Sequence, residues 1–276
     1  MSAPAPLRLR PMEVGDILDE TFRIYRRHFL LLAGISVILA IPAAGLAGYG
    51  FFTIFGTFVQ AASTGQQFDF NSVLPSLSVL VVGYLITILL SPFSYAAVIY
   101  AACESALGRP VTIWGAFQGV LRRYFAILGF IFLTFLMAIA FCLFPLWIWI
   151  WVRWVALLPA MFVENVGLVA GLGRSWRLVE GRWWRTFFIL FLIGLIWYFA
   201  GVALAAFIGL GSGLIGSVVS SYIVLAVLQG AQVIISALVN PVLQIAIVLI
   251  YFDLRVRKEA LDLFQLAQRV SSTQPA

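Results

Sequence analysis

Long apolar runs alternate with four short basic islands along this chain. The islands cover residues 8–27, 109–123, 174–185 and 255–269, and they hold every Lys and Arg except Arg153. Each gap between islands is long enough for two helices of about 20 residues, the length that crosses a bilayer. Because Lys and Arg collect on the cytoplasmic side of membranes, the chain should leave and return between islands. The pattern predicts six spans with both termini on the cytoplasmic side.

The apolar runs set the boundaries of these spans. We expect spans at about residues 29–50, 73–106, 125–144, 145–164, 186–210 and 218–252. Outer turns are expected at 63–72, near Pro145 and at the charge-free stretch 211–217. The third and fourth spans are the least separated, since no polar loop divides residues 125–164. The predicted fold class is all-α, a polytopic transmembrane helical bundle.

Each island also carries an apolar stripe at helical spacing, which predicts a short helix in the membrane surface. The stripes lie within residues 13–28, 112–124, 169–179 and 253–270, and Thr112 offers an N-cap to the second. Residues 1–12 form a flexible N-terminus, 13–252 the membrane domain, and 253–276 a C-terminal amphipathic helix and tail. The surface helices should lie on the cytoplasmic face.

A surface helix followed by a two-span hairpin occurs three times, near residues 13–108, 109–165 and 166–252. The helix-to-span junctions share arginine and aromatic residues: Arg26-Arg27-His28-Phe29, Arg122-Arg123-Tyr124-Phe125 and Arg182-Trp183-Trp184-Arg185. Two interpretations stay open. The junctions indicate a threefold internal repeat, or they reflect the basic and aromatic residues that flank most membrane helices.

The composition supports a membrane protein. The chain is 63% hydrophobic and 10% charged, against about 45–50% and about 25% in soluble domains. Its net charge of +6 does not indicate nucleic acid, because the cations stand beside membrane-length apolar runs, where anionic headgroups are the nearer partner. The candidate residues for binding anionic lipid or a membrane partner are Arg26, Arg27, Arg122, Arg123, Arg174, Arg177, Arg182 and Arg185.

Two expected spans carry polar residues on one face, three or four positions apart. They are Tyr84, Thr87, Ser91 and Tyr95 in the second span, and Gln229, Gln232, Ser236, Asn240 and Gln244 in the sixth. These faces either make hydrogen bonds between helices or line a cavity for a polar or lipid substrate.

Arg153, Glu104 and Glu164 are ionisable residues within or beside the spans, where such residues indicate a function by default. Arg153 stands among tryptophans, so it either marks a functional site, extends toward the outer headgroups or stacks on an indole. Glu104 and Glu164, near the inner ends of their spans, are expected to pair with Arg109, Arg174 or Arg177.

The sequence offers little support for catalysis. His28 is the sole histidine, and Cys103 and Cys142 lack metal-ligand spacing, so we expect no metal and no cofactor. Neither a nucleophile elbow nor a phosphate-binding loop is present.

Three segments resemble the signature segments of the glycerophosphoryl diester phosphodiesterase membrane domain family. They are RPMEVGDILDETFRIYRRHFL at 10–30, GRSWRLVEGRWWRTFF at 173–188 and YFDLRVRKEALDLF at 251–264, and the stretch 153–164 around Pro159 is also similar. The resemblance implies a bacterial multi-pass membrane protein with basic surface helices. In some members this region is joined to a soluble phosphodiesterase barrel whose histidines and carboxylates bind a metal. One histidine cannot supply that chemistry, so we expect no enzyme.

Two functions remain. The first is a non-catalytic multi-pass protein of a bacterial cytoplasmic membrane that binds anionic lipid, a membrane-protein partner or a second copy of itself through its arginines. The alternative is a transporter or flippase-like protein that uses the polar faces of the second and sixth spans.

Overall fold

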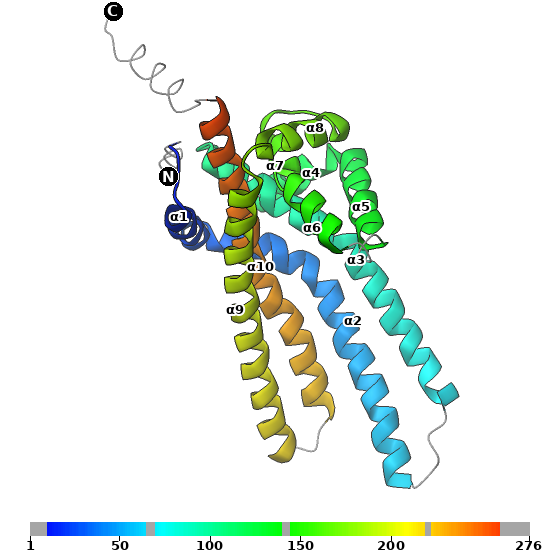
Figure 1. Cartoon of the computed structure of the whole chain (residues 1–276). Helices are drawn as coiled ribbons and strands as arrows, with labels where there is room; N and C mark the ends of the chain where they lie inside the picture. The colour runs from blue at the N-terminus through cyan, green and yellow to red at the C-terminus, as the bar shows by residue number, and fades with distance from the viewer. Residues whose placement is uncertain (1–9, 65–69, 140–143, 219–221, 260–276) are drawn as a thin grey trace, which may run out of the picture. The chain divides into compact units, whose positions relative to one another are not determined.

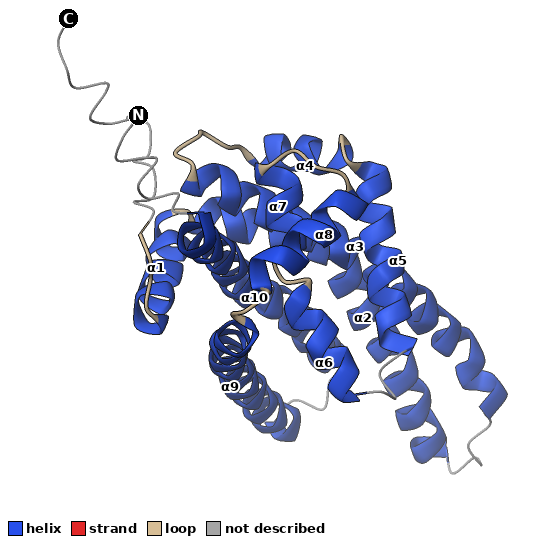
Figure 2. Ribbon diagram, turned by 45° about the horizontal axis from the view of Figure 1, so that its top comes forward, coloured by secondary structure: helices blue, strands red, loops and turns tan. Residues whose placement is uncertain are grey.

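The computed structural model describes residues 10–64, 70–139, 144–218 and 222–259, and over these residues the regular structure is helical throughout (Figure 2). The helices are α1 (Val14–Arg27), α2 (Phe29–Thr64), α3 (Phe70–Ala106), α4 (Ile113–Leu121), α5 (Tyr124–Ile139), α6 (Phe144–Arg153), α7 (Leu157–Val163), α8 (Leu168–Val179), α9 (Trp183–Val218) and α10 (Tyr222–Glu259).

Five segments in the described part of the chain are long and apolar enough to cross a membrane, and a sixth is added if α4 and α5 count as one bent span. The all-α, multi-pass prediction is therefore confirmed. Four of these helices are long: α2 and α9 have 36 residues, α3 has 37 and α10 has 38. At about 1.5 Å per residue, each exceeds the hydrocarbon core of about 30 Å.

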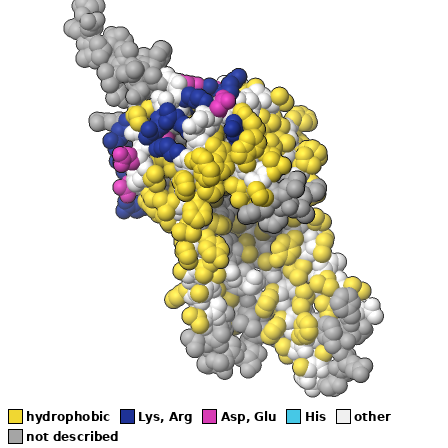
Figure 3. Space-filling view, viewed as in Figure 1, with side chains coloured by type: hydrophobic (Ala, Val, Ile, Leu, Met, Phe, Trp, Pro, Cys, Tyr) yellow, Lys and Arg dark blue, Asp and Glu magenta, His cyan; other side chains and the backbone are white. Residues whose placement is uncertain are grey.

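The chain divides into two compact units that differ in their content of charged residues. The first comprises Met1–Leu32, Tyr95–Leu195 and Pro241–Ala276, and the second Ala33–Ser94 and Ile196–Asn240. Every charged residue that the structure describes belongs to the first, which we call the charged unit; the second is the apolar unit. Lys, Arg, Asp and Glu side chains accordingly gather on the charged unit in Figure 3.

Small residues bring α2 and α10 together within the apolar unit. A Cβ added at Gly48 would lie 3.1 Å from the carbonyl oxygen of Ala226, and one added at Gly230 would lie 3.1 Å from that of Ala44. Both helices thus place two small residues four positions apart at their contact, the pattern that lets membrane helices approach backbone to backbone.

The core of the charged unit forms around α7 and the last turns of α10. All five residues from Leu157 to Met161 are buried, as are residues 245–254 of α10. Gly171 lets α8 pack on α7, because a Cβ there would lie 2.9 Å from side-chain atoms of Leu157 and Met161. Helices α4 to α8 gather in this unit (Figure 1).

Two expected boundaries were wrong. The predicted turn at 211–217 is helical, since α9 continues to Val218; a backbone without water must satisfy its own hydrogen bonds, and glycine is frequent in membrane helices. Residues 253–259 do not begin a separate surface helix but complete α10, where Asp253, Leu254 and Val256 are buried. The rest of the expected C-terminal helix, 260–276, lies outside the described residues, as do residues 1–9.

The middle of the chain departs from a simple hairpin. The expected fourth span is divided into α6 and α7 by a turn at residues 154–156, and α4 meets α5 at 80°. Pro145 lies in the first turn of α6, and the turn expected beside it falls on residues 140–143, outside the description. The expected outer loop at 63–72 is shortened, because α2 reaches Thr64 and α3 begins at Phe70.

The surface helices form where their stripes predicted them, as α1, α4 and α8, and the Thr112 hydroxyl caps α4 by accepting from the Gly115 N–H at 3.0 Å. Each ends in a short break before a longer helix, at His28, at Arg122–Arg123 and at residues 180–182. The order of a surface helix, a short break and a longer helix therefore occurs three times in the described chain. Equivalence of the three hairpins stays a prediction.

Candidate functional site

Glu164, at the end of α7, is the centre of a cluster of buried and half-buried polar groups. Both of its carboxylate oxygens accept from Nε of Arg174, at 2.9 and 2.7 Å, and one accepts from the Tyr251 hydroxyl at 2.8 Å. Glu259 pairs with both Arg174 and Arg255, and Arg255 also lies 3.6 Å from Glu164. This cluster, the Glu164 cluster, ties α7 and α8 to α10.

The electrostatics of the Glu164 cluster favour the charged form of Arg174. Burial lowers the pKa of the Arg174 guanidinium, but hydrogen bonds to Glu164 and Glu259 outweigh burial and raise the pKa above its ordinary value. The predicted pairing of Glu164 with Arg174 is thus confirmed. Glu104 pairs with Arg109 at 3.2 Å.

Asp253 forms a second polar centre, which holds the main chain at Met12. Its carboxylate is 1% exposed, accepts from the Met12 N–H at 2.8 Å and from Arg257 Nε at 2.9 Å, and pairs with Arg185. Arg185 and Arg257 also donate to the Met12 carbonyl oxygen, at 2.6 and 2.8 Å. We call this arrangement the Asp253 clamp.

Two more of the candidate arginines make contacts within the protein. Arg123 donates to the Val166 carbonyl at 2.9 Å and to the side chain of Asn165. Asn165 has φ 56°, a left-handed conformation that asparagine tolerates better than most residues. Arg182 donates to the carbonyl of Arg257 at 3.4 Å. Arg123, Arg174, Arg182 and Arg185 are therefore held by acceptors within the protein.

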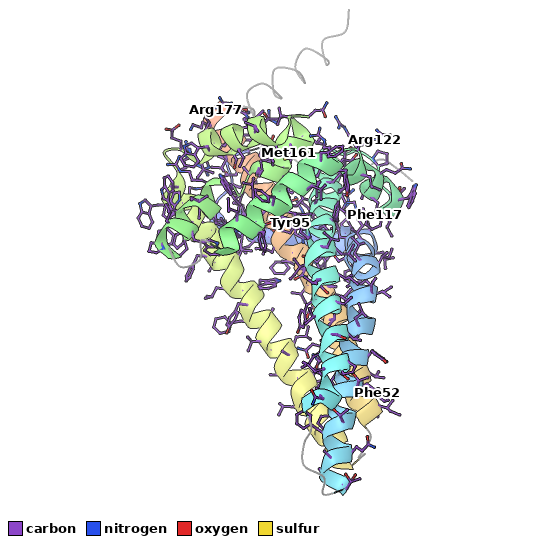
Figure 4. All side chains as sticks on the ribbon, turned by 90° about the vertical axis from the view of Figure 1, so that its right-hand side faces the viewer. Phe52, Tyr95, Phe117, Arg122, Met161 and Arg177 are labelled. Carbon is purple, nitrogen blue, oxygen red and sulfur yellow. The ribbon has the colours of Figure 1, made fainter. Side chains whose placement is uncertain are left out.

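The other four candidate arginines are exposed. Arg26, Arg27, Arg122 and Arg177 form no side-chain hydrogen bond or ion pair with any described residue. Arg122 and Arg177 lie at the edge of the charged unit in Figure 4. Beside the first pair, burial and the charge of Arg27 lower the pKa of His28, so this histidine is neutral at pH 7.

Large apolar side chains surround these exposed arginines. Helices α1 and α4 bury aliphatic and small residues against the protein, such as Ile17, Thr21 and Ala116, and leave several aromatic ones outside. Trp114 is 68% exposed and Phe125 is 85% exposed. The other exposed large apolar residues beside the arginines are Phe22, Phe29, Leu30, Leu121, Tyr124 and Val169. Exposed arginine next to exposed aromatic and aliphatic side chains is typical of a membrane interface.

Arg153 adopts one of the arrangements considered from the sequence, which is stacking on an indole ring. Its guanidinium carbon lies 5.0 Å from the Trp149 ring centroid and 4.4 Å from that of Trp176, so it stacks on indoles. Trp176 belongs to α8, between Arg174 and Arg177. Arg153 therefore lies beside a basic surface helix rather than reaching toward the opposite headgroups.

The two polar faces differ from each other. On α3, Thr87 and Ser91 donate to carbonyls of their own helix, at 2.8 and 3.4 Å, and Tyr84 is 68% exposed. The Ser91 bond reaches Ile88, the residue whose helical partner would be the missing N–H of Pro92. Thr87 and Ser91 therefore bond to their own backbone, whereas Tyr95, on the same face, is half-buried and lines a cavity within the charged unit.

On α10 the polar face has fewer partners. Gln229, Gln232 and Asn240 are half-buried and Ser236 is exposed. Gln244 is 6% exposed, and its Oε1 has no hydrogen-bond partner among the described residues. A buried amide oxygen without a donor is costly, so this face is the less fully satisfied of the two.

The remaining chemistry of the described residues is sparse. Their His, Cys, Asp and Glu side chains gather in no group that could hold a metal, and Cys103 is buried. A cavity of about 160 Å³ lies within the charged unit. Its lining is largely aromatic: Tyr95, Phe130, Thr134, Trp147, Trp151, Trp154, Val155, Leu158 and Ile247.

Sequence reasoning missed Met12, Tyr251, Asp253 and Arg257 as parts of the polar centres. Asp253 gave one usable signal, a carboxylate directly after a long apolar run, whereas nothing marked Met12, which contributes only its backbone. Comparison with family models, with curated proteins and with solved structures gave no match. The family resemblance therefore stays a prediction that rests on the three signature segments, and the chain is described as a multi-pass helical membrane protein.

Proposed function

We propose that this multi-pass membrane protein binds anionic phospholipid headgroups through Arg26, Arg27, Arg122 and Arg177, and catalyses no reaction. The observation that carries the proposal is the division of the eight candidate arginines. Four are held by acceptors inside the protein, and four are exposed among bulky apolar side chains. Each cation near an anionic membrane surface contributes about 1 kcal/mol.

The same proposal gives the protein an orientation. The exposed arginines belong to islands that also contain α1, α4 and α8, so we place these helices on the cytoplasmic face of a bacterial membrane, in line with the cation bias. The arginines that bind lipid would also suit an acidic segment of a membrane-protein partner or of a second copy. Lipid is favoured because the bulky residues beside the arginines suit an interface of headgroups and acyl chains.

Replacing Arg26, Arg27 and Arg122 by glutamine should lower the preference for anionic lipid at least about tenfold, given about 1 kcal/mol per cation. The purified chain is reconstituted in bilayers that contain brominated phosphatidylglycerol or brominated phosphatidylcholine. Quenching of tryptophan fluorescence by each lipid gives their relative binding constant.

The matched control replaces Arg10, Arg23 and Arg109 by glutamine. These residues are also exposed, but each pairs with a carboxylate, Asp16, Glu20 or Glu104. Both variants lower the net charge of +6 by three. The control should keep most of the preference, and an equal loss in both variants would show that net charge alone is responsible and that these arginines form no site.

The second candidate function is transport, and the unsatisfied polar face of α10 favours it. A cysteine at Gln232 or Asn240 should react with a membrane-impermeant thiol reagent if water reaches this face, and a cysteine at Val227, an exposed apolar position on the same helix, should not. Complete protection at Gln232 and Asn240 would remove the transport candidate. The double background Cys103→Ala and Cys142→Ala excludes native thiols from the readout.

A further inference from the structure

Arg153 carries a positive charge that nothing in the described protein neutralises. No ion pair among the described residues includes Arg153. The cations of these pairs are Arg10, Arg23, Arg109, Arg174, Arg185, Arg255 and Arg257. Arg153 instead contacts the rings of Trp149 and Trp176, at 5.0 and 4.4 Å from their centroids. Cation–π contacts contribute about 0.5–2 kcal/mol, which offsets only part of the cost of withdrawing a cation from water.

The hydrogen-bonding capacity of Arg153 is also unused. Its Nε is buried and has no hydrogen-bond partner among the described residues. Indole rings attract the positive charge, but they offer no lone pair that could accept a hydrogen bond from the five N–H groups of the guanidinium. The planar edge of a guanidinium matches two oxygens of a phosphate group, which makes phosphate a better complement than a water molecule or a single carbonyl.

The position of Arg153 is fixed by its surroundings. The Ser175 hydroxyl donates to the Arg153 carbonyl at 2.7 Å and accepts from the Ala156 N–H at 3.2 Å, so α8 holds the chain where α6 ends. The indole N–H of Trp183 donates to the Trp149 carbonyl at 3.2 Å. The main chain around Arg153 and Trp149 is therefore held by α8 and α9, and the guanidinium lies between rings of α6 and α8.

The surroundings of Arg153 also indicate which kind of phosphate compound would suit this position. Trp149 is partly exposed, and Trp184 is 67% exposed and stacks edge to face with Trp183 at 4.8 Å. Exposed tryptophans gather at the depth of the lipid headgroups. Arg177, one of the exposed arginines, follows Trp176 directly. A phosphate group at Arg153 would thus belong to a lipid whose chains lie beside these rings.

We propose that Arg153 binds the phosphate group of one phospholipid molecule, with Trp149 and Trp176 fixing the guanidinium. This inference rests on the proposed function, because it requires the charged unit to contact headgroups. It goes further by naming a single, stoichiometric lipid site that differs from the diffuse attraction exerted by Arg26, Arg27 and Arg122.

The test is native mass spectrometry of the full chain in detergent, stripped of lipid and then titrated with phosphatidylglycerol. Wild-type protein should bind one lipid tightly before any others. Arg153→Gln should weaken this first binding step at least tenfold, and Arg153→Lys should weaken it less, because an ammonium keeps the charge but loses the planar fork. Arg109→Gln is the matched control, because Arg109 is exposed but pairs with Glu104, and it should leave the first step within about twofold of wild type.

Three outcomes would overturn the proposal. They are an unchanged first step in Arg153→Gln, an equal loss in Arg109→Gln, and occupancy of the site by inorganic phosphate alone at the concentration at which the lipid binds. If Arg153→Gln does not fold, Arg153→Lys carries the test, since it keeps the cation–π contacts. The fluorescence assay on the Arg26, Arg27 and Arg122 variant is independent, so the general lipid preference can survive when this site fails.

Discussion

Replacing Asp253 by alanine is expected to lower the free energy of unfolding by about 3–5 kcal/mol, the cost of leaving buried partners uncompensated. The carboxylate is 1% exposed and pairs with Arg185 and Arg257, which are themselves about three-quarters buried. The change also removes the acceptor for the Met12 N–H. Thermal unfolding in detergent, followed by the circular dichroism of the helices, measures the loss.

The matched control for this prediction is Glu104→Ala. Glu104 also pairs with an arginine and is itself 17% exposed, but Arg109 is 64% exposed, so removing Glu104 leaves no buried cation behind. Pairs that reach water contribute about 0–1 kcal/mol. The control should therefore unfold close to wild type. A loss in Asp253→Ala no larger than that in Glu104→Ala would contradict the Asp253 clamp. Arg185→Gln tests the same clamp from its other side and should also destabilise the protein.

Replacing Gly48 by leucine should destabilise the apolar unit by about 1–3 kcal/mol, the usual cost of overpacking. A Cβ at this position already lies 3.1 Å from the Ala226 carbonyl oxygen, and a backbone atom cannot turn aside as a side chain does. The longer side chain must therefore push α2 and α10 apart. The same thermal unfolding measurement reports the change.

Gly45→Leu on the same helix is the control, because a Cβ there meets nothing within 4 Å. This variant should be neutral or slightly stabilising, since leucine has a higher helix propensity than glycine by about 1 kcal/mol. If both leucines were equally harmful, the effect would come from the glycine-to-leucine change itself and the close helix contact would lose its support.

The helical parts of the fold were predictable because they depend on local patterns. Apolar periodicity placed α1, α4 and α8, and the length of the apolar runs placed the four long helices. The pairs Glu164 with Arg174 and Arg255 with Glu259 were also accessible, because their partners are close in the sequence. Where helices end was harder to predict, since the glycine-rich end of α9 stays helical and α10 continues through charged residues.

The division of the arginines could not be predicted from the sequence. Arg122 and Arg123 are neighbours with the same local context, yet Arg122 is exposed and Arg123 binds the backbone and side chain of the turn before α8. Arg185 acquires a partner 68 positions away. Such pairs depend on tertiary packing, which a single sequence does not report.

The Asp253 clamp also has a consequence for the order of events during synthesis. The Met12 N–H and its acceptor on Asp253 are 241 positions apart, so this contact cannot form until Asp253 has left the ribosome. The first helix to emerge is thus among the last to be fixed in place. Until then the Met12 backbone groups and Arg185, which are made earlier, lie in contact with water or with lipid headgroups.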